Sequence, residues 1–339
     1  MMQLLTNSRL RAYRRCPRLH HYSYNLGIRP VVAHENLSFG TLVHAALEAW
    51  WLASAESPED RLNAALLPLE KEPDAFTRAR ARVMIYGYHE RWIDASDEYE
   101  TIAVEREFEI PLVNPATGAE SRTFTLAGKV DAIVQKRATG EFYIMEHKTS
   151  AEDVSPGSEY WARLIMDSQV SIYIGAAASS EPVQGCLYDV LGKPAQRPHA
   201  ATPEADRKYT KPTKAEPTPR LYANQRDTDE TVEEYESRML DHVASNVDRY
   251  YARSTVVRFE SELQAAAADT WHAARMIREA QLADRHPRNP DACHMRGSTC
   301  IFFGVCTGTE SLDDSRFTRV ENVHAELSPR RLPLAPAAE

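Results

Sequence analysis

Residues 126–150 read LAGKVDAIVQKRATGEFYIMEHKTS, and this stretch decides the fold. It predicts two strands joined by a turn in which Gly140 supplies a permissive backbone. Strand side chains repeat every second residue, so Glu146 and Lys148 share a face, and pairing of the strands brings Asp131 close to Glu146. Two carboxylates beside an ammonium suit a hard cation such as Mg²⁺ or Mn²⁺. The hairpin therefore predicts a metal site at a sheet edge, where Lys148 orients a water or stabilises charge on a phosphate.

The alternative for these three residues is an ordinary solvated surface, because Asp, Glu and Lys are common at strand ends. On the trio alone that alternative is favoured, and only the rest of the chain changes the balance.

The composition is that of an ordinary globular protein. The 339 residues suffice for one large domain or two modest ones. No apolar run approaches about 18 residues, so no membrane span is expected, and the first 16 residues lack the apolar core of a signal peptide. With five cysteines and no export signal, we expect a reducing, cytoplasmic setting, in which clustered cysteines suggest metal more than disulfides.

The formal net charge of −9 weighs mildly against a nucleic-acid partner, but the charges are unevenly distributed. Residues 1–34 carry six arginines and no Asp or Glu, with tyrosines between them. That mixture suits a nucleic-acid backbone with exposed bases, although an amphipathic surface helix fits equally well. A second basic stretch, 207–226, belongs to a proline-rich segment that predicts a long loop. A solvated insertion is the favoured interpretation there, ahead of a DNA clamp or a partner site.

The clearest predicted helix covers residues 38–54, whose apolar residues follow three-four spacing. His44 lies beside that stripe, and Glu48 lies one turn on. A lone histidine in this position is ordinarily a partly buried core residue. It becomes a candidate metal ligand if the helix packs over the hairpin.

Other elements follow from the same periodicities. A half-buried strand is predicted over 102–110, with Ile102 on its apolar face, and another strand over 184–190. Further helices are predicted within 58–97, and helical segments are predicted over 157–178, 229–252 and 260–284. Gln169 and Tyr173 are one turn apart and share a face of their helix. The order helix, strand, strand, strand, helix, strand predicts an α/β fold.

Three cysteines lie in one loop-rich segment: Cys293, Cys300 and Cys306. Zinc would take a fourth ligand such as His294, whereas an iron–sulfur cluster would take Cys16 from the other end of the chain. Cys186 lies in an apolar strand and is interpreted as core packing. We favour the four-cysteine site, which would staple the two ends of the chain together.

Together these motifs resemble the PD-(D/E)XK nuclease superfamily, and more narrowly the RecB- and AddB-like nucleases with a 4Fe-4S cluster, which include iron–sulfur exonucleases of CRISPR adaptation. The resemblance covers most of the chain and rests on the joint order of the segments. These are SRLRAYRRCPRLHHYSYNLG (8–27), GTLVHAALE (40–48), GKVD (128–131), EHK (146–148), Gln-x-x-x-Tyr (169–173) and the late cysteines. Compact forms of this type resemble phage or mobile-element nucleases.

The resemblance implies a restriction-endonuclease-like core, a central mixed sheet flanked by helices, with helical ends stapled by the cluster. It also implies a role for each motif residue. The Mg²⁺ or Mn²⁺ ligands would be His44, Asp131, Glu146 and the carbonyl of His147. Lys148 would be the catalytic lysine, and Gln169 and Tyr173 would help to position DNA. The cluster ligands would be Cys16, Cys293, Cys300 and Cys306.

Two features depart from the family pattern. Six residues separate Cys293 from Cys300, where two are often seen, and Val130 stands where the motif has proline before Asp131. No G-x-x-x-x-G-K-[ST] motif is present, which indicates a nuclease without its own helicase motor.

The expected organisation is a single nuclease domain over 1–328. It has a catalytic core at about 38–192, a basic insertion at about 193–228, a helical and cluster-binding part at 229–310, and a disordered tail at 329–339. The expected function is metal-dependent cleavage of DNA, as an exonuclease on single-stranded ends in recombination, repair or processing. A recombination or helicase protein is the expected partner. The alternatives are a non-catalytic DNA-binding scaffold subunit and a zinc-stapled regulatory DNA-binding protein.

Overall fold

The computed structural model describes residues 2–31, 35–53, 56–177, 182–212, 217–295 and 297–327. The predicted disordered tail, 329–339, lies outside the described residues. The elements follow one another in this order: β1 (Gln3–Leu5), α1 (Asn7–Arg15), α2 (Pro17–His20), η1 (His21–Asn25), β2 (Ile28–Pro30), α3 (Glu35–Leu52), α4 (Pro58–Leu66), η2 (Leu67–Lys71), α5 (Ala75–Ser96), β3 (Tyr99–Val113), β4 (Glu120–Lys136), β5 (Phe142–Ser150), α6 (Glu159–Leu164), α7 (Ser168–Ala177), β6 (Val183–Gly192), η3 (Glu204–Asp206), α8 (Val232–Ala244), α9 (Val247–Tyr250), β7 (Tyr251–Val256), α10 (Glu260–Leu282), η4 (Pro290–Ala292), β8 (His294–Met295), β9 (Ser298–Thr299), α11 (Phe303–Thr307) and β10 (Phe317–Arg319).

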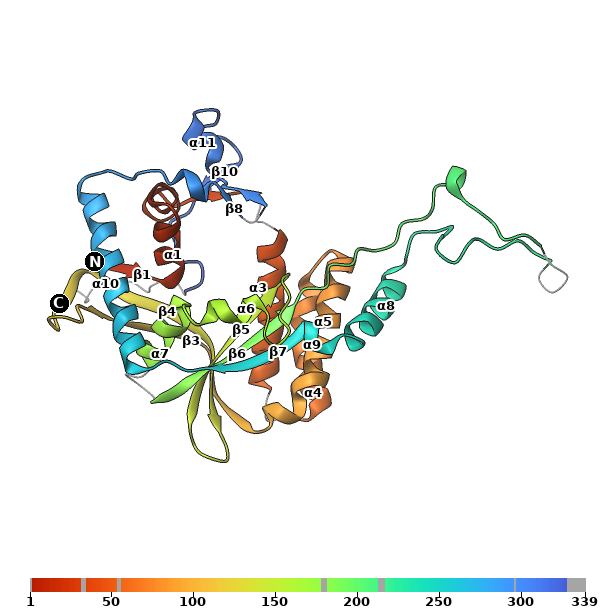
Figure 1. Cartoon of the computed structure of the whole chain (residues 1–339), viewed down its shortest axis with the longest axis horizontal. Helices are drawn as coiled ribbons and strands as arrows, with labels where there is room; N and C mark the ends of the chain where they lie inside the picture. The colour runs from red at the N-terminus through yellow and green to blue at the C-terminus, as the bar shows by residue number, and fades with distance from the viewer. Residues whose placement is uncertain are drawn as a thin grey trace, which may run out of the picture.

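A six-stranded mixed sheet forms the centre of the molecule (Figure 1). Strands β4, β5, β6 and β7 lie side by side in that order, while β1 and β3 both pair with β4. The β4–β5 and β6–β7 pairs are antiparallel, and the β5–β6 pair is parallel. The predicted hairpin is therefore confirmed, and it occupies the middle of the sheet.

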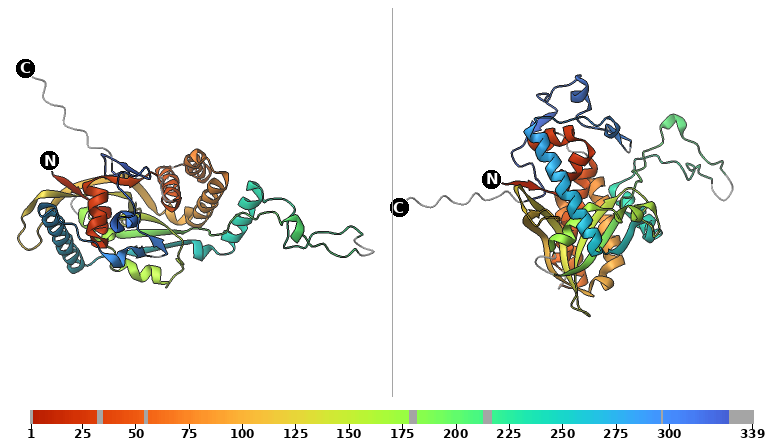
Figure 2. Two further views of the ribbon diagram at one scale, coloured as in Figure 1. Left: turned by 90° about the horizontal axis from the view of Figure 1, so that it is seen from above. Right: turned by 60° about the vertical axis from the view of Figure 1, so that its left-hand side comes forward.

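Helices cover both faces of this sheet (Figure 2). The core on one face packs α3, α4, α5 and α8 against residues such as Met145, whereas the other core packs α1, α7 and α10 against Ile144. Adjacent residues of β5 thus enter different cores, as the period of two requires. The chain has an α/β fold with a mixed sheet flanked by helices, as predicted.

Three local predictions need correction. Ile102 is 41% exposed rather than buried, because the β3–β4 register shifts between Thr101 and Ala103 and leaves Ile102 without a partner in the ladder. The helix predicted over 157–178 is interrupted, since the carboxylate of Asp167 accepts the backbone N–H groups of Gln169 and Val170 and starts α7 afresh.

The third correction concerns 229–252, predicted as helix throughout. Helix α9 ends at Tyr250, and Tyr251 begins the strand β7, which pairs with β6. The aromatic and β-branched residues here favour a strand once a neighbouring strand offers its backbone.

The two ends of the chain meet beside the sheet. Strand β2 near the N-terminus pairs antiparallel with β10 near residue 318. A small core that includes Tyr22, Ile28, Phe302 and Phe317 lies there. No helix in the described part of the chain is both long and apolar enough to cross a membrane.

Candidate active site

Asp131 and Glu146 lie where the central hairpin forks. The ladder between β4 and β5 ends at the pair Ala132–Met145, and these two acids are the next residues on the two strands. Beyond the last pair, the Asp131 side chain takes over the role of a backbone partner, because its Oδ2 accepts the N–H of His147 at 2.6 Å. The Asp131 carboxylate is therefore held against the backbone of β5, the strand that carries Glu146.

Helix α3 packs over the hairpin and brings His44 to the same carboxylate, with Nδ1 of His44 3.6 Å from Oδ1 of Asp131. Burial alone would raise the pKa of Asp131, but hydrogen bonds from His147 and His44 outweigh burial and hold the pKa well below its ordinary value. For His44, burial would lower the pKa and the bond to Asp131 more than offsets it, so the pKa is raised. Helix α3 thus places His44 beside Asp131.

Glu146 is almost completely buried, with 2% of its surface exposed. Its Oε1 accepts the ammonium of Lys148 and, at 2.7 Å, the side-chain amide of Gln169. Its Oε2 is buried and has no hydrogen-bond partner among the described residues. Burial raises the pKa of Glu146 to about 7, although Lys148 opposes this.

Helix α7 supplies Gln169 and Tyr173 on the face that the spacing predicted. The Gln169 amide donates to the Tyr173 hydroxyl at 3.1 Å as well as to Glu146. Gly128 makes room for this contact, since a Cβ there would lie 3.0 Å from the Tyr173 ring and 2.6 Å from Phe108. The glycine of the GKVD segment thus has a packing role.

The donor atoms suit a hard cation only in part. Carboxylate oxygens are what Mg²⁺ and Mn²⁺ prefer, and the unpaired Oε2 of Glu146 is a buried acceptor that costs about 1–3 kcal/mol if nothing binds it. However, the described residues contain no group of three or more His, Cys, Asp or Glu side chains arranged to hold a metal ion. In this arrangement Lys148 and Gln169 donate to Oε1 of Glu146, and the His147 N–H donates to Oδ2 of Asp131. Oδ1 of Asp131 lies beside His44.

Behind the site lies a buried network that the sequence reasoning missed. Nδ1 of the His147 ring lies 3.6 Å from Oδ2 of Asp131. Nε2 of the same ring accepts the indole N–H of Trp51 at 3.1 Å and lies 3.8 Å from Oδ2 of Asp189. Asp189, only 1% exposed, accepts the Tyr88 hydroxyl at 2.7 Å and two hydrogen bonds from Arg253, one from Nε and one from Nη2. The strand register sets Arg253 directly opposite Asp189.

A signal for this network was present in the sequence. Asp189 stands inside the apolar run CLYDVLG, and a carboxylate in a buried strand needs a cationic partner. The partner could not be identified because Arg253 lies on β7, which the periodicity did not predict as a strand. Glu48 was noticed only as a neighbour of His44. Burial and the negative charges of Glu105 and Asp131 raise the pKa of Glu48.

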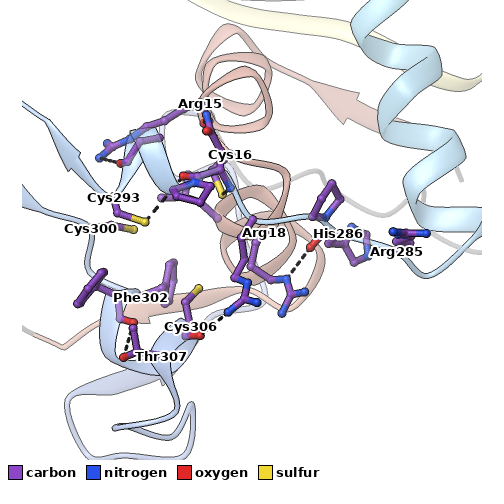
Figure 3. A pocket seen from close by; sticks show the side chains of 17 residues that line it. Arg15, Cys16, Arg18, Arg285, His286, Cys293, Cys300, Phe302, Cys306 and Thr307 are labelled. Carbon is purple, nitrogen blue, oxygen red and sulfur yellow. Dashed lines mark hydrogen bonds between the residues drawn. The ribbon is translucent and has the colours of Figure 1, made fainter.

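The four cysteines predicted to act together border one cavity of about 590 Å³. Figure 3 shows their sulfur atoms facing a common space between the two ends of the chain. Four arginines line the same cavity: Arg15, Arg18, Arg285 and Arg288. His294 lies outside that lining and contacts Thr299 on the neighbouring strand, and Cys186 is buried in the sheet, as predicted.

Hydrogen bonds alone already connect the two ends around this cavity. The backbone N–H of Asn289 donates to Sγ of Cys16 at 3.4 Å, and the Asn289 side chain donates to the Arg15 carbonyl at 2.9 Å. Arg18 donates to the carbonyl of His286 at 2.6 Å. The finding that no described group is arranged to hold a metal ion applies to these cysteines too.

One comparison with known proteins identifies the family. The profile of the PD-(D/E)XK nuclease superfamily matches residues 5–307. No curated protein matches the chain significantly. Among solved structures, the crystal structure of SSO0001 aligns with 64% of this chain and 77% of its own at 14% identity, with a TM-score of 0.22. Because the family match runs from the first strand to the last of the late cysteines, the protein belongs to the PD-(D/E)XK nuclease superfamily, which implies hydrolysis of phosphodiesters, usually with Mg²⁺ or Mn²⁺.

Proposed function

We propose that this protein is a metal-dependent DNA nuclease that acts as an exonuclease on single-stranded ends in recombination, repair or DNA processing. The observation that supports it best is the unpaired, buried Oε2 of Glu146 at the fork where Asp131 and Lys148 also converge. A scaffold protein has no need of a buried acceptor with nothing bound to it, because that acceptor costs stability.

In this proposal Asp131, Glu146, His44 and the His147 carbonyl hold the divalent ion. The ion supplies neutralisation of the phosphate charge and a more acidic bound water. Hydrogen bonding to the His147 N–H and to Gln169 keeps the two carboxylates in place before substrate arrives. Preorganised ligands of this kind need not be reordered during the reaction.

Lys148 acts on the scissile phosphate. Burial lowers its pKa, but the charges of Glu146 and Asp131 outweigh burial, so the pKa lies above its usual value. Lys148 therefore stays cationic at neutral pH, and its ammonium can stabilise negative charge that develops on the phosphate oxygens.

A cleavage assay tests this function. Single- and double-stranded DNA, labelled and blocked at each end in turn, is incubated with Mg²⁺, Mn²⁺ or EDTA. We expect metal-dependent release of short products from single strands with a free end and none from strands blocked at the attacked end. Absence of metal-dependent cleavage on every substrate overturns the nuclease proposal, and cleavage of circular single strands overturns the exonuclease assignment.

We further propose that the protein is of the RecB- and AddB-like type and carries a 4Fe-4S cluster on Cys16, Cys293, Cys300 and Cys306. The shared cavity supports this, and its four arginines would offset the negative charge of four thiolates. Burial raises the pKa of Cys300 and Cys306, so without a metal these thiols stay protonated.

Anaerobic purification tests the cluster. We expect brown protein with broad visible absorption and about four iron atoms per chain, lost in Cys300→Ser and kept in the control Cys186→Ala, whose thiol lies in the sheet core. Colourless protein that contains one zinc ion contradicts the cluster but leaves the cleavage proposal untouched.

A further inference from the structure

A long arm projects from the body of the protein between β6 and α8 (Figure 1). It consists of residues 193–212 and 217–228, and we call it the basic arm. Its two segments run antiparallel and are joined by backbone hydrogen bonds: Thr202 N–H to Arg226 O at 2.8 Å, Thr210 N–H to Arg220 O at 2.8 Å, and Tyr222 N–H to Lys208 O at 3.0 Å. The arm is therefore a paired structure rather than an unstructured linker.

One end of the arm is fixed beside the candidate active site. Strands β5 and β6 pair in register, with Lys148 opposite Val190 and Ser150 opposite Gly192. The first arm residue continues this contact, because the N–H of Lys193 donates to the Ser150 carbonyl at 2.6 Å. The arm thus starts at the same end of the paired strands β5 and β6 at which Lys148 lies.

The returning end is fixed by a buried acid. Glu230, 4% exposed, accepts the N–H of His199 at 2.8 Å and two bonds from the Arg238 guanidinium of α8 at 2.7 and 2.8 Å. Those bonds from Arg238 lower the pKa of Glu230 to about 2. These hydrogen bonds of Glu230 fix the base of the arm to α8, so the arm leaves the body of the protein in a defined direction.

The charge of the arm is opposite to that of the protein. The chain has a net charge of −9, whereas 207–226 carries six basic residues and only Glu216 as an acid. Arg207 donates to the backbone carbonyl of Asp227, whereas Arg226 donates to the carboxylate of Glu234. The exposed basic residues in the described part of the arm are Arg197, nearer its base, and Lys208, Lys211 and Arg220 further out.

Two tyrosines accompany these cations, and both are unusually open to solvent. Tyr209 is 51% exposed and Tyr222 is 46% exposed. Tyr209 pairs with Leu221, and the carbonyl of its neighbour Lys208 binds the N–H of Tyr222, so both rings belong to one short paired segment. Cations that alternate with exposed aromatic rings hold a phosphate backbone while the rings stack on unpaired bases.

We propose that the basic arm binds a single-stranded nucleic acid along a stretch outside the active site. That the bound strand is DNA rests on the proposed function. The positive charge of the arm, its exposed tyrosine rings and its start near Lys148 are observations that do not depend on that function. An acidic protein would be attracted by the lysines but would not call for two exposed stacking rings, so a nucleic-acid strand is the occupant that uses both features.

Binding measured without cleavage tests the arm. Fluorescence anisotropy in EDTA follows the full-length protein on labelled single strands of about 40 and about 8 nucleotides. For Lys208→Ala/Lys211→Ala/Arg220→Ala we expect affinity for the long strand to fall about tenfold. The slope of log affinity against log salt should shrink by about 2, since each phosphate contact contributes about 0.7. Tyr209→Ala/Tyr222→Ala should weaken binding of the long strand and leave that slope unchanged.

The control variant removes equal charge elsewhere. Lys71→Ala/Arg122→Ala/Arg278→Ala takes three exposed cations from η2, β4 and α10. If this control variant loses as much affinity as the arm variant, the proposal is overturned. It is also overturned if the arm variant keeps wild-type affinity for the long strand. That second result is the one expected if the arm binds an acidic protein instead.

The same strands separate this proposal from the nuclease proposal. If the wild-type protein binds long strands through the arm but cleaves neither strand with Mg²⁺ or Mn²⁺, the nuclease proposal fails and the arm proposal stands. Cleavage combined with binding that is independent of the arm would support the nuclease proposal and overturn the arm proposal.

Discussion

Asp131→Asn, Glu146→Gln and Lys148→Ala are each expected to lower DNA cleavage by about a thousandfold or more and to leave the protein folded. In Asp131→Asn the new amide would still offer an oxygen to the His147 N–H, so the fork keeps its shape while the charge that would hold the metal is lost. Glu146→Gln removes the buried charge without changing volume. Lys148→Ala removes the only ammonium that contacts Glu146 in the described structure.

Initial rates with Mg²⁺ and Mn²⁺ measure this effect, and circular dichroism with thermal unfolding checks the fold. Glu120→Gln, at the exposed far end of the same strand as Asp131, is the matched control and should retain wild-type rates. Near-wild-type cleavage by Lys148→Ala would show that the lysine assignment is wrong.

The second large effect concerns stability. Arg253→Met should lower the free energy of unfolding by about 3–5 kcal/mol, because it leaves the charge of Asp189 buried without a cation. Removing both charges, in Asp189→Asn/Arg253→Met, should restore most of that loss, since the amide oxygen still accepts the Tyr88 hydroxyl. Urea unfolding of the three proteins measures the difference.

The control for this prediction is an exposed pair of the same chemistry. Arg91 and Asp248 lie 3.2 Å apart with side chains 42% and 75% exposed, so Arg91→Met should cost less than about 1 kcal/mol. If Arg253→Met proves as mild as Arg91→Met, the network behind His147 does not carry the stability assigned to it.

Prediction from sequence succeeded where the signal was local. The hairpin follows from strand alternation on either side of Gly140, and α3 follows from the three-four spacing of its apolar residues. The face shared by Gln169 and Tyr173 needed only helical geometry. For these elements a window of about 20 residues holds all the information.

Prediction failed where the conformation of one segment depends on its contacts with a segment far away in the sequence. Ile102 has the residue type of a buried position, but a bulge in the pairing with β4 turns it outward. Strand β7 follows directly on a helix, and the backbone of β6 decides its conformation. The Asp167 cap was not recognised as a helix start inside a periodic run.

The sequence by itself determined the α/β class, and it singled out as candidate site residues the acids and lysine of the central hairpin, the histidine on the helix above it and the set of cysteines. Each depends on residue type and short-range period. Only the tertiary structure decided that β4 and β5 separate just at Asp131 and Glu146, that one oxygen of Glu146 is buried without a partner among the described residues, and that Arg253 neutralises Asp189. Those features arise from strand register and burial, which depend on contacts between residues far apart in the chain and leave no periodic trace in either segment alone.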